Sequence, residues 1–346
     1  MTQIAASPIR VGLVGYGMAG RVFHAPLIAA APGLALIAVA SSRADEVRAA
    51  LPGVMVHPTP EALFADPGID LVVIASPTAT HAPLAARALA AGKHVVVDKP
   101  FALNLADARA LVAQAGAAGR TIAVFQNRRW DGDFLTLRRL IGEGLIGEVC
   151  EFESRFDRFR PEVRHRWRED GSAGSGVWFD LGPHLIDQAL LLMGRPEAVS
   201  ADLAALRKDG QSHDHAHVIL HYPHVRAVLR AGMVVAGGAP RFLVHGTRGS
   251  LAKHGIDPQE AQLGAGMRPG DAGWGIDPET LRHWDGEGRQ TALPIDRGAQ
   301  ESFYVTLAAG LLGEGPPPNE PVEMLAVQEV LEAAIRASDE GRTIKI

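Results

Sequence analysis

The chain of 346 residues is poor in cysteine, in aromatic side chains and in long apolar runs. Its single cysteine, Cys150, excludes an intrachain disulfide and the metal sites that several cysteines would build. The most apolar window, residues 25–40, contains two prolines and a glycine and is shorter than the roughly 20 apolar residues that cross a bilayer. With 34 Lys and Arg against 39 Asp and Glu, the chain also lacks the basic excess of nucleic-acid-binding and membrane-surface proteins. We therefore expect neither nucleic acid nor membranes among its partners.

The chain is rich in hydrophobic residues, which can form packed cores. Hydrophobic residues make up 47% of the sequence and charged residues 21%, which excludes disorder as the dominant state. At about 100–200 residues per domain, the length predicts two domains. Residues 1–10 show no basic stretch followed by an apolar segment, so we expect no secretory signal and a cytoplasmic protein.

The first part of the chain, residues 1–125, alternates short apolar strands with alanine-rich helices. Strands of this kind, alternating with helices, predict βαβ units and a doubly wound parallel sheet, the Rossmann type of dinucleotide-binding domain. The expected strands are Ile9–Val14, Ala35–Ala40, Leu71–Ala75, His94–Val97 and Thr121–Phe125, with helices over Pro83–Ala91 and Leu105–Ala118.

The remainder, residues 126–346, has a different pattern. Alternating polar and apolar residues predict longer strands of an open, mainly antiparallel sheet, and hence an α+β domain. We expect this domain to serve substrate binding and oligomerisation. The expected elements are strands in Glu148–Phe159, His213–Tyr222 and Arg226–Val234, helices over Trp178–Met193 and Val322–Ser338, and a long loop over residues 255–300.

A glycine-rich loop follows the first expected strand. Gly15, Gly17 and Gly20 stand in the spacing GxGxxG, with Tyr16, Met18 and Ala19 between them. In a strand–turn–helix context the three glycines allow a tight turn, approach of the backbone to a pyrophosphate and close packing of helix on strand. The sequence therefore predicts a dinucleotide site.

The end of the second expected strand favours NADP over NAD. An NAD site places a carboxylate there to hold the ribose 2′-hydroxyl, whereas this chain has Ser41, Ser42 and Arg43. Two hydroxyls and a guanidinium suit a 2′-phosphate. The alternative is that Arg43 only opens the next helix and Asp45 serves the ribose of NAD.

Two groups of residues carry the expected chemistry. Asp98 and Lys99 follow a buried strand, at the edge where doubly wound sheets bind ligands, and a lysine there can stabilise a developing alkoxide. Asp180 and His184 are four residues apart on the expected helix, so the carboxylate can steady the imidazole as a general base. Each group alone is also typical of an ordinary surface or helical ion pair.

Taken together, these motifs resemble the Gfo/Idh/MocA oxidoreductase family over essentially the whole chain. Three longer segments are similar to its branch of NADP-dependent scyllo-inositol 2-dehydrogenases. They are Phe125–Asp131, Phe156–Val163 with Arg166-Trp167, and Trp178–Gln188.

The resemblance implies roles for individual residues. Lys99, Asp180 and His184 match the catalytic positions, with Lys99 and His184 sharing the substrate hydroxyl. Asp187 matches an acidic position that binds ring hydroxyls. The cofactor-bordering positions matched are Ser76, Pro77, Thr78, His81, Asp98 and Pro100. Two departures are Asp98 in place of the usual glutamate and Thr78 in place of a common asparagine.

The prediction of function does not depend on several further residues. Asn127, Arg128 and Asp157 are candidates for reading substrate hydroxyls, and Trp167 is placed either over the nicotinamide or in the core. The alternating histidines at 213, 215 and 217 are typical of a sheet face rather than of a metal site, and we expect no metal. Cys150 is expected in the core.

We conclude that the sequence predicts an NADP-dependent oxidoreductase acting on a secondary alcohol of a cyclitol or sugar, working as a homodimer or homotetramer. NAD as the cofactor, a sister activity on an aldose, and a non-catalytic dinucleotide-binding regulator are the alternatives.

Overall fold

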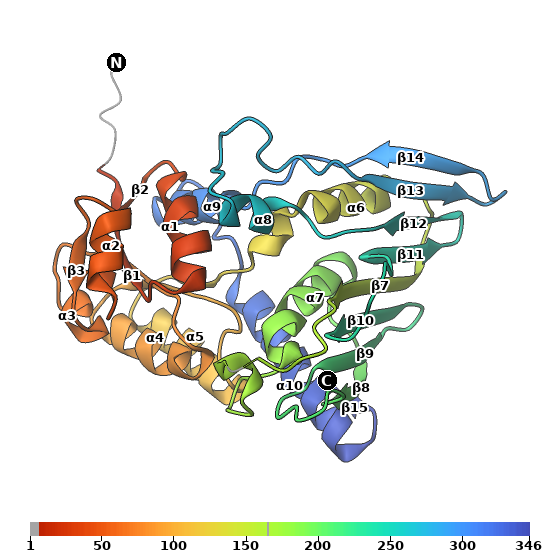
Figure 1. Cartoon of the computed structure of the whole chain (residues 1–346), viewed down its shortest axis with the longest axis horizontal. Coiled ribbons are helices and arrows are strands. Elements are labelled where there is room, and N and C mark those ends of the chain that lie inside the picture. The colour runs from red at the N-terminus through yellow and green to blue at the C-terminus, as the bar shows by residue number, and fades with distance from the viewer. Residues whose placement is uncertain (1–6, 165) are drawn as a thin grey trace. The chain divides into compact units, whose positions relative to one another are not determined.

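The computed structural model describes residues 7–164 and 166–346, and the chain divides into two compact units (Figure 1). The first unit contains residues 7–127, 259–274 and 299–325. The second contains residues 128–258, 275–298 and 326–346, apart from position 165. The chain thus passes between the units several times.

The first unit is built on a parallel sheet of six strands in the order β3-β2-β1-β4-β5-β6. Five of these strands agree with the sequence prediction to within one residue at each end. The short β3 was missed, because its three residues are only partly buried or exposed and give no apolar run. The strands are β1 (Ile9–Val14), β2 (Leu34–Ala40), β3 (Met55–His57), β4 (Leu71–Ile74), β5 (His94–Val97) and β6 (Ile122–Val124).

Helices connect these strands and complete the doubly wound topology. Two of them begin at side-chain caps: Thr59 accepts a hydrogen bond from Ala62 N, and Asn104 accepts one from Asp107 N. The helical elements of this unit are η1 (Ala19–His24), α1 (Ala25–Ala29), α2 (Ala44–Ala50), α3 (Pro60–Phe64), η2 (Thr78–Thr80), α4 (His81–Ala90), α5 (Leu105–Ala117), α8 (Gln259–Gly264) and α9 (Ser302–Leu311).

The topology places the expected cofactor residues at one edge of this sheet. Strands β1, β2, β4 and β5 run parallel, so the loops after their carboxyl ends meet along the same edge. The loops that begin there carry Gly15, Ser41, Ser76 and Asp98. The predicted Rossmann domain is confirmed.

The second unit is built on a sheet of nine strands in the order β14-β13-β12-β11-β7-β10-β9-β8-β15. Only β7 and β10 run parallel; every other adjacent pair is antiparallel. This confirms the predicted large, mainly antiparallel sheet. The strands are β7 (Val149–Asp157), β8 (Ala198–Ala204), β9 (His215–His221), β10 (Arg226–Gly232), β11 (Phe242–Gly246), β12 (Gly249–Lys253), β13 (Thr280–Asp285), β14 (Gln290–Pro294) and β15 (Ile344–Lys345).

Helices cover one face of this sheet. Apolar residues of α6 (Gly132–Gly142), of α7 (Val177–Met193) and of α10 (Pro321–Glu340) from Val327 onward pack with alternate residues of β7, β8, β9 and β10 in one core. The short helices η3 (Asn127–Trp130) and η4 (Trp167–Glu169) lie in the connections. Because burial alternates along β7 and β9, the opposite face carries the polar members of each strand.

Two expectations were wrong. Residues 255–300 contain α8, β13 and β14 rather than a long loop. The two strands form because β13 pairs with β12 and β14 pairs with β13. Most of their side chains are partly or fully exposed, so the sequence shows no apolar period there. Cys150 is exposed rather than in the core, since it lies at the beginning of β7, before the buried Phe152.

Candidate active site

The glycine-rich loop after β1 has the backbone that a pyrophosphate site needs. Gly15 has φ +95°, and a Cβ there would lie 2.5 Å from the carbonyl oxygen of Ala75. A Cβ on Gly20 would collide with the carbonyl oxygen of Gly15, whereas a Cβ on Gly17 would meet no heavy atom within 4 Å. Two glycines therefore permit the turn and the close packing, and the third leaves open space beside the backbone. This fits a dinucleotide phosphate. Between the glycines, Tyr16 is buried and Met18 is exposed.

The loop after β2 presents a guanidinium and two hydroxyls. Arg43 N donates to Ser41 Oγ at 3.0 Å. The Arg43 guanidinium lies 3.7 Å from Glu46, with both side chains more than half exposed. Asp45 is already paired with Arg48 at 3.0 Å. Arg43 is therefore accessible to an anion at the position where a ribose substituent is read.

The carboxylate of Asp98 is held at the end of β5. Its Oδ1 accepts a hydrogen bond from Lys99 N at 2.8 Å, and its Oδ2 lies 3.8 Å from His24 Nε2. Burial raises the pKa of Asp98, but the nearby His24 and the charges of Lys99 and His81 outweigh it, so the pKa lies below its usual value. Asp98 is therefore ionised beside Lys99.

Behind Asp98 lies a buried aromatic group that the sequence analysis missed. His24 is fully buried, and its Nδ1 lies 2.6 Å from the hydroxyl oxygen of Tyr304. The Phe125 ring lies 4.3 Å from the imidazole, centroid to centroid. Burial, and then the charge of Asp98, raises the pKa of Tyr304 well above its usual value. No local pattern signals this contact, because the two bonded residues are 280 positions apart.

The loop after β4 is tied to the loop after β5 by one imidazole. His81, the first residue of α4, places Nδ1 2.8 Å from the carbonyl oxygen of Pro100 and Nε2 2.9 Å from that of Ser76. Thr78 is buried and Pro77 is exposed. The structure thus brings together, within the first unit, the cofactor-bordering residues that the sequence predicted at these two loops.

The other expected catalytic residues lie on α7 of the second unit. Asp180 and His184 are one turn apart and share a face of the helix. Asp180 Oδ1 lies 3.4 Å from Arg168 Nε, and His184 is 5% exposed with its ring 6.5 Å from that of Phe156. A carboxylate and a nearly buried imidazole therefore stand side by side, with a guanidinium behind the carboxylate.

The residues expected to read substrate hydroxyls are mostly engaged within the protein. Asp187 is buried and accepts hydrogen bonds from both Nε and Nη2 of Arg129, at 2.9 and 2.6 Å. Arg128 Nη1 donates to Asp131 at 3.1 Å, and Asn127, in the first unit, donates to the Gln300 side chain at 2.9 Å. Their contacts with a substrate stay a prediction.

Asp157 and Trp167 complete the expected site residues of the second unit. Asp157 is half-buried at the end of β7, and burial raises its pKa against the charges of Arg155, Arg230 and His215. The Trp167 ring is half-buried in η4, with the Arg168 guanidinium 4.5 Å above its centroid.

A second group of buried side chains, which the sequence analysis did not predict, contacts α7. Arg241 is buried, donates to the Gln188 side chain at 2.8 Å and lies 4.0 Å above the Phe156 ring. Gln188 in turn donates to the carbonyl oxygen of Arg128 at 2.9 Å. This set joins the residue before β11 to α7 and η3 through side chains far apart in the sequence.

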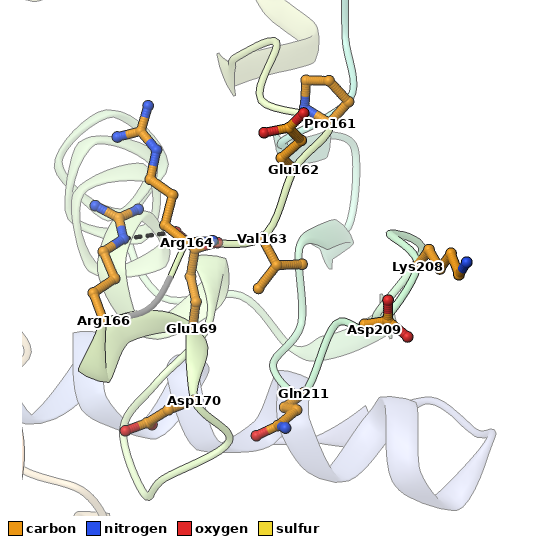
Figure 2. A pocket seen from close by; sticks show the side chains of 10 residues that line it. All are labelled: Pro161, Glu162, Val163, Arg164, Arg166, Glu169, Asp170, Lys208, Asp209 and Gln211. Carbon is orange, nitrogen blue, oxygen red and sulfur yellow. Dashed lines mark hydrogen bonds and ion pairs between the residues drawn. The ribbon is translucent and has the colours of Figure 1, made fainter.

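The second unit also has an open pocket of about 520 Å³ lined mainly by charged side chains (Figure 2). At its wall, Glu169 is almost buried and paired with Arg166 at 2.6 Å and with Arg207 at 2.9 Å. The lining residues are Pro161, Glu162, Val163, Arg164, Arg166, Glu169, Asp170, Lys208, Asp209 and Gln211. Acidic and basic groups are mixed, so the lining selects no single sign of charge.

Residues 7–164 and 166–346 contain neither a metal-ligand cluster nor a helix suited to span a membrane. No cluster of three or more His, Cys, Asp or Glu side chains suited to a metal ion occurs in that part of the chain. Within the same ranges no helix combines the length and apolarity of a membrane span.

Comparison with known proteins agrees with this arrangement. The family model described as the NAD-binding Rossmann fold of the Gfo/Idh/MocA oxidoreductases matches residues 9–126, and the model of their C-terminal alpha/beta domain matches residues 138–346. The uncharacterized oxidoreductase YdgJ of Escherichia coli is 48% identical over 97% of this chain and 98% of its own. The scyllo-inositol 2-dehydrogenase (NADP(+)) IolW of Bacillus subtilis is 36% identical over 98% of this chain and 96% of its own.

A solved structure shares the whole architecture. The crystal structure of a putative oxidoreductase from Klebsiella pneumoniae superposes with a TM-score of 0.93, at 48% identity, covering 98% of this chain and 95% of that one. Both domain matches and these full-length similarities lead to one conclusion: the chain belongs to the Gfo/Idh/MocA oxidoreductase family.

Proposed function

We propose that this protein is an NADP-dependent oxidoreductase that moves a hydride between the nicotinamide and a secondary alcohol of a cyclitol or sugar. The observation that carries the proposal is the retention of three groups: Lys99 after β5, and Asp180 with His184 on α7. They occur in a chain that is 36% identical to a scyllo-inositol 2-dehydrogenase (NADP(+)). A scyllo-inositol-like ring is therefore the first substrate to test, with an inosose as the ketone in the reverse direction.

In the oxidative direction the residues divide the work. A bound nicotinamide supplies the acceptor for the hydride that leaves the carbinol carbon. His184 takes the hydroxyl proton, and Asp180 stabilises the imidazolium that results. Lys99 stabilises negative charge developing on the oxygen. In reduction the same groups act in reverse, with His184 returning the proton to the alkoxide oxygen.

The preference for NADP rests on the loop after β2. Arg43 is more than half exposed and stands beside the hydroxyls of Ser41 and Ser42, and Asp45 is paired with Arg48. A guanidinium binds a 2′-phosphate by charge-assisted hydrogen bonds, which a ribose hydroxyl cannot match.

The first test is the formation of NADPH at 340 nm with the purified protein. The substrates are scyllo-inositol, myo-inositol and common aldoses, each with NADP and with NAD. We expect turnover of scyllo-inositol with NADP. Turnover of an aldose alone would keep the mechanism and replace the substrate, and tight NADPH binding without turnover in either direction would contradict the proposal.

Lys99→Ala tests the catalytic assignment. We expect kcat to fall by at least about 100-fold, because the charge on the reacting oxygen loses its cation, while NADPH binding, measured by fluorescence titration, is retained. Lys208→Ala removes a lysine of the pocket in Figure 2 and serves as the control. Unchanged turnover in Lys99→Ala would refute the assignment.

Arg43→Ala tests the cofactor preference. We expect KM for NADP to rise by about 10-fold or more and KM for NAD to change little, since only NADP carries the phosphate. Arg87→Ala, which removes an exposed arginine of α4 paired with Glu61, is the control. Equal effects of Arg43→Ala on both cofactors would place Arg43 outside the ribose site.

A non-catalytic dinucleotide-binding regulator is the second candidate. It would bind NADPH through the same glycine loop but would need no acid–base pair on α7. The Lys99→Ala experiment separates the two, because a regulator has no turnover to lose.

The outer face of the nine-stranded sheet is the surface we propose for self-association into a dimer or tetramer. Its outward side chains, such as Ile219, Val228 and Leu243, mix with charged groups and are only partly exposed. Light scattering coupled to gel filtration measures the mass directly. Replacing Val228 with aspartate is expected to shift that mass toward the monomer.

A further inference from the structure

The His81 imidazole has an unusual pair of partners. The ring is 1% exposed, and each of its nitrogens lies in hydrogen-bonding geometry to a backbone carbonyl oxygen: Nδ1 to Pro100 at 2.8 Å and Nε2 to Ser76 at 2.9 Å. Carbonyl oxygens only accept hydrogen bonds. Both nitrogens must therefore donate if both contacts are hydrogen bonds.

A neutral imidazole cannot satisfy this geometry. It carries one N–H and one nitrogen lone pair, so one of the two contacts would press a lone pair against a carbonyl oxygen at less than 3 Å. Turning the ring over would place carbon atoms at both oxygens and leave the nitrogens without these acceptors in a buried site. The doubly protonated ring is the state that makes both bonds.

Two influences oppose a charge at this position. The pKa of His81 lies below its usual value: burial is the largest influence and lowers it, and the charge of Lys99 also lowers it. His81 is the first residue of α4, where the helix dipole disfavours a cation. With the pKa lowered in this way the ring would be neutral near pH 7, and one of the two contacts would be repulsive. The balance of burial and charge and the geometry of the contacts therefore point to different protonation states, and the proposal follows the geometry.

A compensating anion lies nearby. The Asp98 carboxylate and the two carbonyl contacts act on His81 in the opposite direction to burial. Asp98 is itself ionised, in part because His81 and His24 are close. The carboxylate at the end of β5 thus serves as counter-ion for a charge on α4.

We propose that His81 is a buried imidazolium at neutral pH, with Asp98 as its counter-ion, and that it positions Lys99 by clamping the loop after β5 to the loop after β4. The His81 ring joins the carbonyl groups of Pro100 and Ser76. It therefore fixes Pro100, the residue next to Lys99, relative to the loop after β4, which is predicted to contact the cofactor. We class His81 as a positioning residue, because its ring is 1% exposed and both of its nitrogens face backbone carbonyl oxygens. Its effect on Lys99 rests on the proposed function; its protonation state does not.

The test of the protonation state is long-range ¹H–¹⁵N NMR of the full protein labelled with ¹⁵N-histidine, with the His81 signals identified from a His81→Gln sample. We expect both ring nitrogens of His81 to be of the protonated type from pH 6 to 8. His94 is an internal control, because its Nδ1 accepts a hydrogen bond from Thr121 N at 3.0 Å and so carries a lone pair. An unprotonated nitrogen on His81 at pH 7 would overturn the proposal.

Asp98→Asn tests the counter-ion. We expect the ring of His81 to lose its second proton at a pH at least one unit lower than in the unaltered protein. An unchanged titration would show that the carbonyl groups alone hold the charge, which contradicts the role given to Asp98.

The kinetic arm uses His81→Gln, which keeps one donor and loses the other. We expect kcat to fall by about 10-fold with KM for the alcohol little changed, because Lys99 is misplaced rather than removed. An unaltered kcat would refute positioning of Lys99. If the unaltered protein shows no turnover, the proposed function fails, and the NMR result still decides the state of His81.

Discussion

Asp133 supplies a prediction about stability whose sign and size follow from burial. It is the second residue of α6 and fully buried. Its Oδ1 accepts a hydrogen bond from Phe134 N at 2.7 Å, and its buried Oδ2 has no hydrogen-bond partner among residues 7–164 and 166–346. Burial raises the pKa of Asp133 from 3.8 to about 6; Asp257 also raises it, while Arg241 and Lys253 lower it. The folded protein therefore holds this proton more tightly than the unfolded chain does.

The sign follows from linkage. A carboxyl with a raised pKa in the folded state contributes stability that is fully present below pH 3.8 and is lost as the pH rises through about 6. A shift of roughly two units corresponds to about 3 kcal/mol in full, of which about half is lost between pH 5 and pH 8.

Asp133→Asn removes the titrating group and keeps an oxygen for Phe134 N. We expect the variant to gain stability relative to the unaltered protein as the pH rises, by about 1–2 kcal/mol between pH 5 and pH 8. The assay is urea unfolding followed by circular dichroism at pH 5, 6, 7 and 8. Asp339→Asn, at an exposed position near the end of α10, is the control.

Two results would refute the reasoning. The same pH dependence in Asp133→Asn and in the unaltered protein would mean that Asp133 does not titrate in this range. A gain at low rather than high pH would mean that the carboxylate is stabilised by Arg241 and Lys253, so that the charges outweigh burial.

Further changes test the phosphate loop, α7 and the buried tyrosine. Gly15→Ala is expected to lower the unfolding free energy by about 1–3 kcal/mol, because the residue has φ +95° and the added Cβ meets a backbone oxygen. Gly17→Ala has open space around its Cβ, so we expect unchanged urea unfolding but weaker NADPH binding. Equal losses of stability in the two variants would contradict this. Asp187→Asn breaks a buried ion pair in which Asp187 accepts two hydrogen bonds from Arg129, so we expect the free energy of unfolding by urea to fall by about 3–5 kcal/mol. A fall below about 1 kcal/mol would show that the pair is not buried in solution. Tyr304→Phe keeps the ring, removes one buried hydrogen bond and should cost about 1–3 kcal/mol, and no measurable change in the urea midpoint would mean that the bond is not formed.

Local pattern was sufficient for much of the fold. The strands of the first unit appear as short apolar runs because both faces of a parallel sheet are covered, and the long strands of the second unit appear as alternation because one face is not. The same reasoning failed at β13 and β14. Their side chains are largely exposed, and they are strands because a neighbouring strand offers hydrogen bonds, which no periodicity records.

The candidate site divides in the same way. The spacing of Gly15, Gly17 and Gly20 and the helical spacing of Asp180 and His184 are properties of a short stretch of chain, so the sequence determined the phosphate loop and placed the carboxylate beside the imidazole. It also determined which residues follow the strands of a parallel sheet. The family and its class of reaction came from the resemblance of these motifs, together with three longer segments, to known oxidoreductases.

Only the tertiary structure decided how those groups are held and charged. The bond from His24 to Tyr304 joins positions 280 residues apart, and the two carbonyl oxygens around His81 belong to different strand ends. The pKa of Asp133 likewise depends on the charges of Arg241, Asp257 and Lys253, which come from distant segments of the chain. Protonation responds to every group within a few ångströms of a side chain, and the sequence lists its neighbours along the chain rather than in space.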